Sequence, residues 1–278
     1  HAGLDAAAAV RDADVALLLG IRAPWHPASR SPGESTWIAA LGADPIHRDL
    51  PYYGYGLDLA LAGRIGPSLD RLLSASQSYL AADPRRAAAV KTRRDEIELE
   101  STPRRVAWAQ GGADRKPALP LDRVWVSWER SRRTPGDASI IEETITPRTA
   151  IQQALTAVRP GMFFAGAIGG LGTGLGTALG VKAARPGQPV ICLIGDGSFH
   201  YNPALAALGA MQDLGLPILV VIYNNRGYVS QVQAIREYFP GGYAEQAPAA
   251  AGMAILPAPD YPALARAYGG WGMVVEHP

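Results

Sequence analysis

Two short polar turns, separated by one helical segment, carry residue types that could bind a metal ion and a phosphate group. Asp196 lies in the sequence GDGS, directly after the apolar run 190–194, and Asn225 follows a second apolar run, 217–223. Asp196 offers a carboxylate, Asn225 an amide oxygen, and Gly227 a bare backbone carbonyl. Three oxygen donors of mixed charge suit Mg²⁺, which completes its octahedron with phosphate oxygens and water.

The residues next to Asp196 suit a diphosphate. Gly195 and Gly197 allow the backbone to approach a ligand closely. We expect Ser198 to begin a helix, whose N-terminal amides attract phosphate. Together with the oxygen donors, these residues predict a metal-bridged diphosphate site.

The elements that must position these turns are two strands joined by a helix over 205–214. Runs that are apolar throughout, such as 190–194 and 217–223, suit parallel strands buried on both faces. A right-handed crossover would place both carboxyl ends at the same edge of the sheet. Open α/β sheets bind ligands at that edge.

The pairing of GDGS with a later NN turn resembles the thiamine diphosphate (ThDP) motif of the family that contains acetolactate synthase, benzoylformate decarboxylase and pyruvate decarboxylase. The resemblance extends upstream through 165–182, AGAIGGLGTGLGTALGVK, and is strongest to the benzoylformate decarboxylase branch, through GGLG followed by GDGSxxY. A Rossmann nucleotide site is excluded, because no GxGxxG/A match starts at Gly170, Gly172 or Gly174. The chain also has no GK[ST] sequence, which excludes a P-loop.

The resemblance implies roles for particular residues. Gly169 would accept a hydrogen bond from the pyrimidine amino group through its carbonyl, and Leu171 would lie beneath the bend of the cofactor, so that the amino group comes near C2 of the thiazolium. We take Gly169 and Leu171 as the catalytic candidates; the alternative for Leu171 is an ordinary core leucine. Asp196, Asn225 and Gly227 would hold Mg²⁺.

Further cofactor contacts are implied at other positions. Thr146 and Tyr201 would reach the diphosphate, and the alternative for Thr146 is a helix N-cap before Pro147. The full set of expected cofactor-binding residues is Thr146, Gly169, Gly170, Leu171, Gly195, Gly197, Ser198, Tyr201, Asn225 and Gly227. For Gly172, Gly176 and Gly180, which recur every four residues, we expect close packing of a helix against the sheet.

The order of the elements predicts an α/β fold, in which a parallel-sheet diphosphate-binding domain follows part of a second, Rossmann-like α/β domain. We expect residues 1–110 to be a partial middle domain, 111–121 a Gly/Pro linker, and 122–278 the diphosphate-binding domain. In the first part we expect a buried strand at 14–20, a second strand at 36–41, a helix with an apolar stripe at 66–82, and a charged helical segment at 83–110. In the second, strands at 138–144, 162–165 and 273–275 and a helix at 152–158 complete the pattern. Relatives of this kind carry FAD or ADP in the middle domain in some cases, but no nucleotide loop supports FAD here.

Composition narrows the classes of partner. The 278 residues are 48% hydrophobic and 18% charged, as in globular proteins with a sizeable core. A formal net charge of +1 argues against nucleic acid or an anionic membrane as partner, and no apolar run has the length of a membrane span. We expect a cytoplasmic location. Cys192, the only cysteine, lies in the strand before GDGS, where an inert apolar role is expected.

The resemblance implies an enzyme that acts on a 2-keto acid, by decarboxylation alone or followed by carboligation, with ThDP and Mg²⁺ as cofactors. Such enzymes also need a pyrimidine-binding domain, and they are homo-oligomers, dimers or tetramers. We expect that domain on a missing part of the protein or on another chain, and we expect the C-terminal end to be truncated. Two alternatives stay open: a non-catalytic ThDP-binding subunit, and an unrelated Mg²⁺-dependent phosphate-binding domain.

Overall fold

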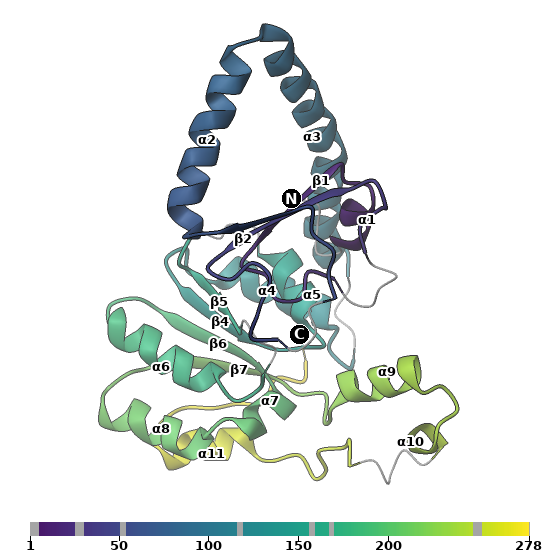
Figure 1. Cartoon of the computed structure of the whole chain (residues 1–278). Helices are drawn as coiled ribbons and strands as arrows, with labels where there is room; N and C mark the ends of the chain where they lie inside the picture. Colours follow the sequence, from purple (N-terminus) through teal and green to yellow (C-terminus); the bar gives the residue numbers. More distant parts are fainter. Residues whose placement is uncertain are drawn as a thin grey trace. The chain divides into compact units, whose positions relative to one another are not determined.

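The computed structural model describes residues 6–25, 31–50, 54–115, 119–155, 159–166, 170–246 and 252–277. The chain divides into two compact units, His1–Val106 and Ala107–Pro278 (Figure 1). Among the helices of the described ranges, none combines the length and the apolar character needed to cross a membrane.

The first unit is built on a three-stranded parallel sheet with the order β1-β2-β3. The two strands expected near 14–20 and 36–41 are confirmed, and the third follows a loop. The elements of this unit are α1 (Ala6–Arg11), β1 (Val15–Leu19), β2 (Trp37–Gly42), β3 (Leu59–Ala62), α2 (Ile65–Ala81) and most of α3 (Pro84–Ala113).

The burial expected for the strand at 14–20 is wrong. In β1 only Leu18 is buried, whereas Val15 is 58% exposed, and every residue of β3 is exposed. The helix α2 has the predicted bounds and apolar stripe, but none of its residues is buried. The apolar pattern therefore predicts the type of β1 and α2, but the described residues do not cover the apolar faces of β1, β3 and α2.

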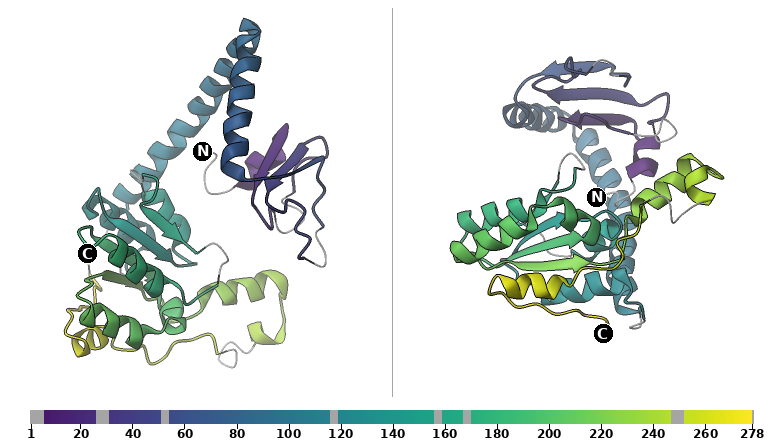
Figure 2. Two further views of the ribbon diagram at one scale, coloured as in Figure 1. Left: turned by 60° about the vertical axis from the view of Figure 1, so that its left-hand side comes forward. Right: turned by 90° about the horizontal axis from the view of Figure 1, so that it is seen from below.

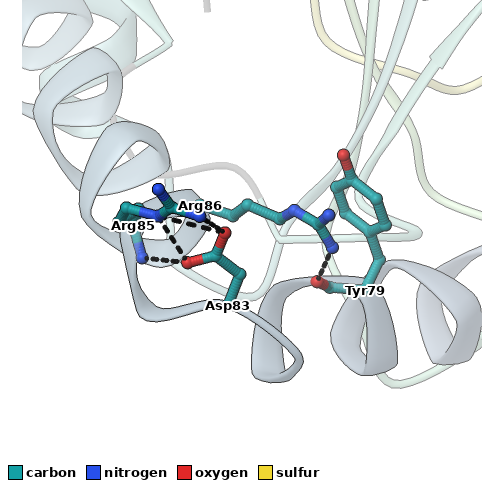
Figure 3. Close-up of polar contacts among 4 residues, drawn as sticks. All are labelled: Tyr79, Asp83, Arg85 and Arg86. Atoms are coloured by element: carbon teal, nitrogen blue, oxygen red, sulfur yellow. Dashed lines mark hydrogen bonds and ion pairs between the residues drawn. The ribbon is translucent and has the colours of Figure 1, made fainter.

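The turn between α2 and α3 is held by two arginines (Figure 3). Arg85 pairs with Asp83 through its guanidinium, with Nη2 2.9 Å from Oδ2, and these contacts lower the pKa of the Asp83 carboxyl. Arg86 donates from Nη1 to the Tyr79 carbonyl at 3.0 Å, and its guanidinium lies 3.8 Å from the centre of the Tyr79 ring. All four residues lie at a helix–helix turn that is mostly exposed, so these contacts shape the turn and contribute little stability.

The helix α3 runs further than the sequence predicts. Gly111 and Gly112, expected to open a linker, lie inside the helix, which ends at Ala113. A Cβ atom at Gly112 would meet the side chain of Trp128 at 2.4 Å. Glycine is therefore needed at position 112 for close packing of two helices rather than for a flexible joint.

The second unit is a four-stranded sheet with helices on both faces. Its strand order is β5-β4-β6-β7, and all three pairings are parallel. The elements are α4 (Arg123–Arg133), β4 (Ser139–Glu143), α5 (Arg148–Ala154), β5 (Phe163–Ala165), α6 (Gly174–Ala184), β6 (Val190–Gly195), α7 (Asp196–Tyr201), α8 (Ala204–Asp213), β7 (Leu219–Tyr223), α9 (Val229–Tyr238), α10 (Tyr243–Gln246) and α11 (Tyr261–Ala267).

Two apolar clusters hold this sheet. One lies between the sheet and the helices α6, α7, α8 and α11, and includes Ile141, Leu175 and Ile194. The other lies on the opposite face, where Ile151 of α5 packs against Ile140 and Leu193. Figure 1 shows α6, α8 and α11 on one side of the sheet with α4 and α5 on the other, and Figure 2 shows the same strands from two further directions. The predicted parallel α/β architecture is confirmed.

Three local predictions are wrong. The helix after β4 begins at Arg148 and ends at Ala154, so it starts before the predicted 152–158. The strand expected at 273–275 does not form in the described segment 271–277, whose apolar residues, such as Val274, are exposed. A Cβ at Gly176 or at Gly180 would meet nothing within 4 Å, so helix packing does not explain these two glycines.

Candidate functional site

The two predicted turns lie at the same edge of the sheet. β6 and β7 are parallel neighbours, and their register pairs Gly195 with Tyr223, the last residue of each strand. Asp196 follows the first strand directly, and the Asn224-Asn225 turn follows the second. The parallel pairing of the two apolar runs, with both carboxyl ends at one edge of the sheet, is confirmed.

The side chains of Asp196 and Asn225 converge on one backbone amide. The N–H of Gly227 donates to Asp196 Oδ2 at 3.1 Å and to Asn225 Oδ1 at 3.2 Å. Asp196 is 2% exposed, and its other oxygen, Oδ1, accepts from the amide of Gly197 at 2.8 Å. Two oxygen atoms that could bind a metal ion are thus held within hydrogen-bond distance of one backbone nitrogen at the edge of the sheet.

The turn that carries Gly227 is fixed by a distant part of the chain. Gly227 forms an antiparallel bridge with Ala254, and the amides of Tyr228 and Ile255 donate to Met253 and Arg226 at 2.8 and 2.9 Å. A Cβ at Gly227 would meet the carbonyl oxygen of Met253 at 2.5 Å. Only glycine allows the two backbone segments to come this close.

Arg226 has the left-handed conformation, with φ of 61°. Asn224 supports it, because the Asn224 Oδ1 atom accepts from the Arg226 amide at 3.1 Å. A non-glycine residue in this conformation costs on the order of 1 kcal/mol. The turn is therefore a strained feature that its neighbours hold in place, which is common at ligand sites.

The two glycines of GDGS differ in what they allow. A Cβ at Gly197 would meet the Tyr228 ring at 2.7 Å, so this glycine makes room for an aromatic side chain of the same site. A Cβ at Gly195 would meet only the Ser198 hydroxyl at 3.6 Å, an ordinary contact. Partial burial, followed by the charges of Tyr201 and Asp196, raises the pKa of the Tyr228 hydroxyl.

Ser198 does not begin the helix, contrary to expectation. The helix α7 begins at Asp196 with Gly195 as its N-cap, so the buried Ser198 is its third residue. The chain leaves the strand and enters the helix without an intervening turn, because Gly195 takes an extended conformation directly before Asp196. Asn202 and Pro203 then separate α7 from α8.

Two pairs of aromatic or imidazole side chains lie near the end of α7. Tyr201 is 62% exposed, and its ring centre lies 6.2 Å from that of Tyr228. His200 is exposed, and its Nε2 atom lies 3.3 Å from the Tyr261 hydroxyl. Burial, together with Asp196 and Tyr228, raises the pKa of Tyr261 to about 12, so this hydroxyl stays protonated at neutral pH.

The glycine-rich loop is described in part. Gly169, the predicted backbone acceptor, lies outside the described residues, whereas Gly170 and Leu171 are described. Leu171 is half-buried and does not belong to either apolar cluster of the described second unit. Leu171 is therefore not part of the apolar core described for this unit.

Thr146 lies in the turn between β4 and α5. The N-cap alternative is wrong, because α5 begins at Arg148 with Pro147 at the N-cap position and without a side-chain cap. The buried Glu142 shapes this turn: its Oε1 atom accepts from the amide and the hydroxyl of Thr144, and its Oε2 atom lies 3.2 Å from Arg148 Nε. Thr146 is half-buried in this turn.

Sequence reasoning missed two buried polar residues, Glu143 and Asn202. Glu143 ends β4 and accepts hydrogen bonds from the loop before α6, and Asn202 links that loop to α7. The signal for Glu143 was present, since a glutamate inside a run of buried strand residues needs partners. Their position relative to the site could not be read from the sequence.

The donor set fits Mg²⁺ better than a metal that needs several acidic, histidine or cysteine ligands. Over the described ranges, no group of three or more such side chains could hold a metal ion. Asp196 and Asn225 instead supply one carboxylate and one amide oxygen side by side. Such a sparse set suits an ion that keeps water and phosphate oxygens as its other ligands.

A comparison with known families defines the class of the second unit. Residues 146–278 match the family described as "Thiamine pyrophosphate enzyme, C-terminal TPP binding domain". The matched segment lies within the second unit and contains β5, β6 and β7 together with the GDGS and NN turns, so this part of the chain is similar to a thiamine pyrophosphate-binding domain.

Among the curated proteins, two similar to this chain are a decarboxylase and a synthase. Over 170 residues the chain is 34% identical to a benzoylformate decarboxylase of Pseudomonas aeruginosa, a match that covers 61% of this chain and 29% of the relative. Over 164 residues it is 31% identical to the large subunit of acetolactate synthase isozyme 3 of Escherichia coli, covering 59% of this chain and 26% of the relative. The matched region thus spans less than a third of either relative.

Solved structures show the same fold. The chain superimposes on a thiamine diphosphate-dependent 4-hydroxybenzoylformate decarboxylase of Rhodococcus jostii with a TM-score of 0.68 and 21% identity, covering 99% of this chain and 46% of that one. A benzoylformate decarboxylase of Polynucleobacter necessarius gives a TM-score of 0.66 at 21% identity, with 97% and 46% covered. At this identity the likeness concerns the fold alone.

Proposed function

We propose that this chain is part of a ThDP- and Mg²⁺-dependent enzyme that acts on a 2-keto acid, by decarboxylation or by decarboxylation followed by carboligation. The observation that carries the proposal is the convergence of Asp196 and Asn225 on Gly227 at the carboxyl edge of a thiamine pyrophosphate-binding domain. The relatives named as benzoylformate decarboxylase and acetolactate synthase support a keto-acid substrate.

In this proposal the predicted site residues, of which only Gly169 lies outside the described ranges, bind and orient the cofactor. Asp196, Asn225 and the Gly227 carbonyl hold Mg²⁺ and, through it, the diphosphate, while Thr146, Ser198 and Tyr201 contact the diphosphate end. Leu171, with Gly169 and Gly170, shapes the loop on which the rings of the cofactor rest. When bound, ThDP supplies the electron sink for cleavage next to a carbonyl, and the protein supplies orientation and charge neutralisation.

The proposal requires a second domain. We assign the acid that protonates the pyrimidine ring to a pyrimidine-binding domain, on another part of the protein or on another chain. Because such a site is shared between domains, we propose that the protein forms a homo-oligomer. We also propose a cytoplasmic location. Support comes from the coverage of the relatives: the matched region accounts for less than a third of each.

The test measures ThDP binding with and without Mg²⁺, by calorimetry or by NMR titration. We expect Asp196→Ala to abolish the Mg²⁺-dependent part of the binding. Asp213→Ala, at the exposed end of α8, is the matched control and should bind as wild type does. Mg²⁺-dependent binding of normal affinity in Asp196→Ala would remove Asp196 from the site.

The partial coverage of the relatives also favours a second candidate, a ThDP-binding subunit without catalysis of its own. The two candidates differ in turnover once a pyrimidine-binding domain is supplied. An unrelated phosphate-binding domain would instead bind Mg²⁺ and inorganic pyrophosphate with no preference for ThDP.

A further inference from the structure

The carboxylate of Glu143 is held at the N-terminus of α6. Its Oε1 atom accepts from the amides of Gly172 and Thr173, the latter at 3.2 Å, and its Oε2 atom accepts from the amide of Gly174 at 2.7 Å. Glu143 is 5% exposed. Three successive amides thus bind a carboxylate of the same chain, in the place where a helix N-terminus would otherwise attract a phosphate.

Asn202 extends this contact to the GDGS helix. Its Nδ2 group donates to Glu143 Oε2 at 2.9 Å and to the Ser198 carbonyl at 2.8 Å, and its Oδ1 atom accepts from the Leu175 amide at 2.9 Å. Asn202 is 6% exposed, and each polar atom of its amide has a partner. The pair therefore joins the end of β4, the start of α6 and the helix α7.

Two glycines make this junction possible. A Cβ at Gly174 would meet Glu143 Oε2 at 2.5 Å, so a larger residue would push the carboxylate off its amides. Gly172 has φ of 105°, and a Cβ there would meet the Tyr201 carbonyl oxygen at 2.8 Å. The loop that follows Leu171 is thus fitted against both Glu143 and the end of α7.

The neighbouring carboxylate, that of Glu142, holds a loop on the other face of the sheet. Successive side chains of a strand point to opposite faces, and Glu142 contacts Thr144 and Arg148 on the α5 side of the sheet. Glu143 contacts the loop before α6 on the other side. Two adjacent glutamates thus hold two different loops of the same sheet edge.

We infer that Glu143 and Asn202 are positioning residues: they set the loop that carries Leu171 at a fixed distance from the turn that carries Asp196. This inference rests on the proposed function, because it assigns the loop to the rings of ThDP and the turn to its diphosphate. The two parts of the site come from separate segments, and the Glu143–Asn202 contact is the buried polar link between them. Without it, the diphosphate anchor stays intact while the ring-binding loop loses its fixed position.

The first test follows the loop itself by amide hydrogen exchange. Glu143→Gln replaces one acceptor oxygen with an NH₂ group, which would face amides and cannot accept from them. We expect at least tenfold faster exchange of the amides of 172–175, with unchanged exchange in the second half of α6. Glu142→Gln is the matched control, since it alters the adjacent buried carboxylate and should affect the Thr144 amide while leaving 172–175 unchanged.

The second test separates positioning from a general loss of stability. Mg²⁺ with inorganic pyrophosphate reports the diphosphate anchor alone, and Mg²⁺ with ThDP reports the anchor together with the loop. In Glu143→Gln we expect at least a tenfold loss of affinity for ThDP and less than a twofold change for pyrophosphate, each followed by NMR titration. Equal losses for both ligands, or unchanged exchange at 172–175, would overturn the inference.

A glycine pair covers the case in which Glu143→Gln does not fold. Gly174→Ala displaces the carboxylate but leaves its charge in place, and it should reproduce both effects. Gly176→Ala, in the same helix, adds a methyl group that meets nothing within 4 Å and should behave as wild type does. The titrations are repeated with a pyrimidine-binding domain added in trans. If the wild-type chain binds neither ligand even then, the proposed function fails, and the exchange pattern alone decides whether Glu143 holds the loop.

Discussion

Asp196 and Asn225 accept hydrogen bonds from the same backbone N–H, that of Gly227, although 29 positions separate them along the chain. The register of two parallel strands places them there, and the bridge of Gly227 to Ala254 holds the shared donor. A substitution that moves the Gly227 N–H should therefore displace both Asp196 Oδ2 and Asn225 Oδ1.

Gly227→Ala is expected to weaken Mg²⁺-dependent ThDP binding at least tenfold. The new methyl group would lie 2.5 Å from the Met253 carbonyl oxygen, so the turn must move and its N–H must leave the two oxygens. Isothermal titration checks this result. Gly187→Ala, in the turn before β6, introduces the same methyl group with no neighbour within 4 Å and should bind normally.

Asp122 is expected to stabilise the second unit through the start of α4. Its Oδ1 atom accepts from the amides of Val124 and Trp125 at 2.9 and 3.0 Å. Loss of such an N-cap costs about 1 kcal/mol, so Asp122→Ala should lower the free energy of unfolding by roughly that amount. Denaturant titration followed by tryptophan fluorescence measures it.

The same residue predicts a pH dependence. Partial burial raises the pKa of Asp122, but the amides of Trp125 and Val124 together with Arg115 outweigh it and lower the pKa overall. A carboxyl with a lowered pKa stabilises the fold above its ordinary value near 4, and this contribution is lost as the pH falls through the folded pKa. Asp122→Asn keeps the cap without the charge, so its difference from wild type should shrink at low pH; a constant difference would contradict the assignment.

Cys192 is expected to stay unreactive in the folded protein and to weaken the fold at high pH. Burial, followed by the charge of Glu143, raises the pKa of its thiol to about 12. Between the ordinary value near 8.5 and this value the unfolded chain releases a proton that the folded one keeps, so stability falls with rising pH by up to about 1.4 kcal/mol per pH unit. Cys192→Ala lacks this contribution, and its stability should decline less steeply from pH 9 to 10.5. Parallel slopes, or rapid native-state labelling by a thiol reagent, would contradict the prediction.

The 278-residue chain alone is expected to turn over no 2-keto acid. A diphosphate anchor binds ground state and transition state alike, and such uniform binding does not accelerate the chemical step. Adding a pyrimidine-binding domain in trans should restore exchange of the cofactor C2 proton, measured by NMR after acid quench. Fast exchange by this chain alone would show that it contains its own activating acid.

The sequence allowed the elements around Asp196 to be predicted because apolar runs determine strands and polar turns determine where they end. From these runs we predicted that β6 and β7 are parallel and that the site lies at the edge where both strands end. Burial was harder: α2 has the predicted apolar stripe yet no buried residue, since periodicity shows that a face is apolar and not what covers it. The same limit explains the missing strand near Val274.

Site residues were predicted where the local sequence is distinctive, and they were missed where it is not. Asp196 stands between two glycines at a strand end, which distinguishes it from other aspartates. Glu143 and Asn202 carry no such mark, because their importance comes from amides of a loop that is 29 to 31 residues away from Glu143. Gly197 also leaves room for the Tyr228 ring, a contact that no local sequence pattern encodes.

The Gly227–Ala254 bridge sets a minimum length for any protein engineered from this domain. All of the predicted ligands lie at or before Gly227, so a design that kept only these positions could stop there. Yet the turn receives its shape from Met253 and Ile255, beyond α9 and α10. A transplanted site would need either that returning segment or a substitute strand that offers a carbonyl to the Tyr228 amide, whereas the helices between could be exchanged for a shorter connection.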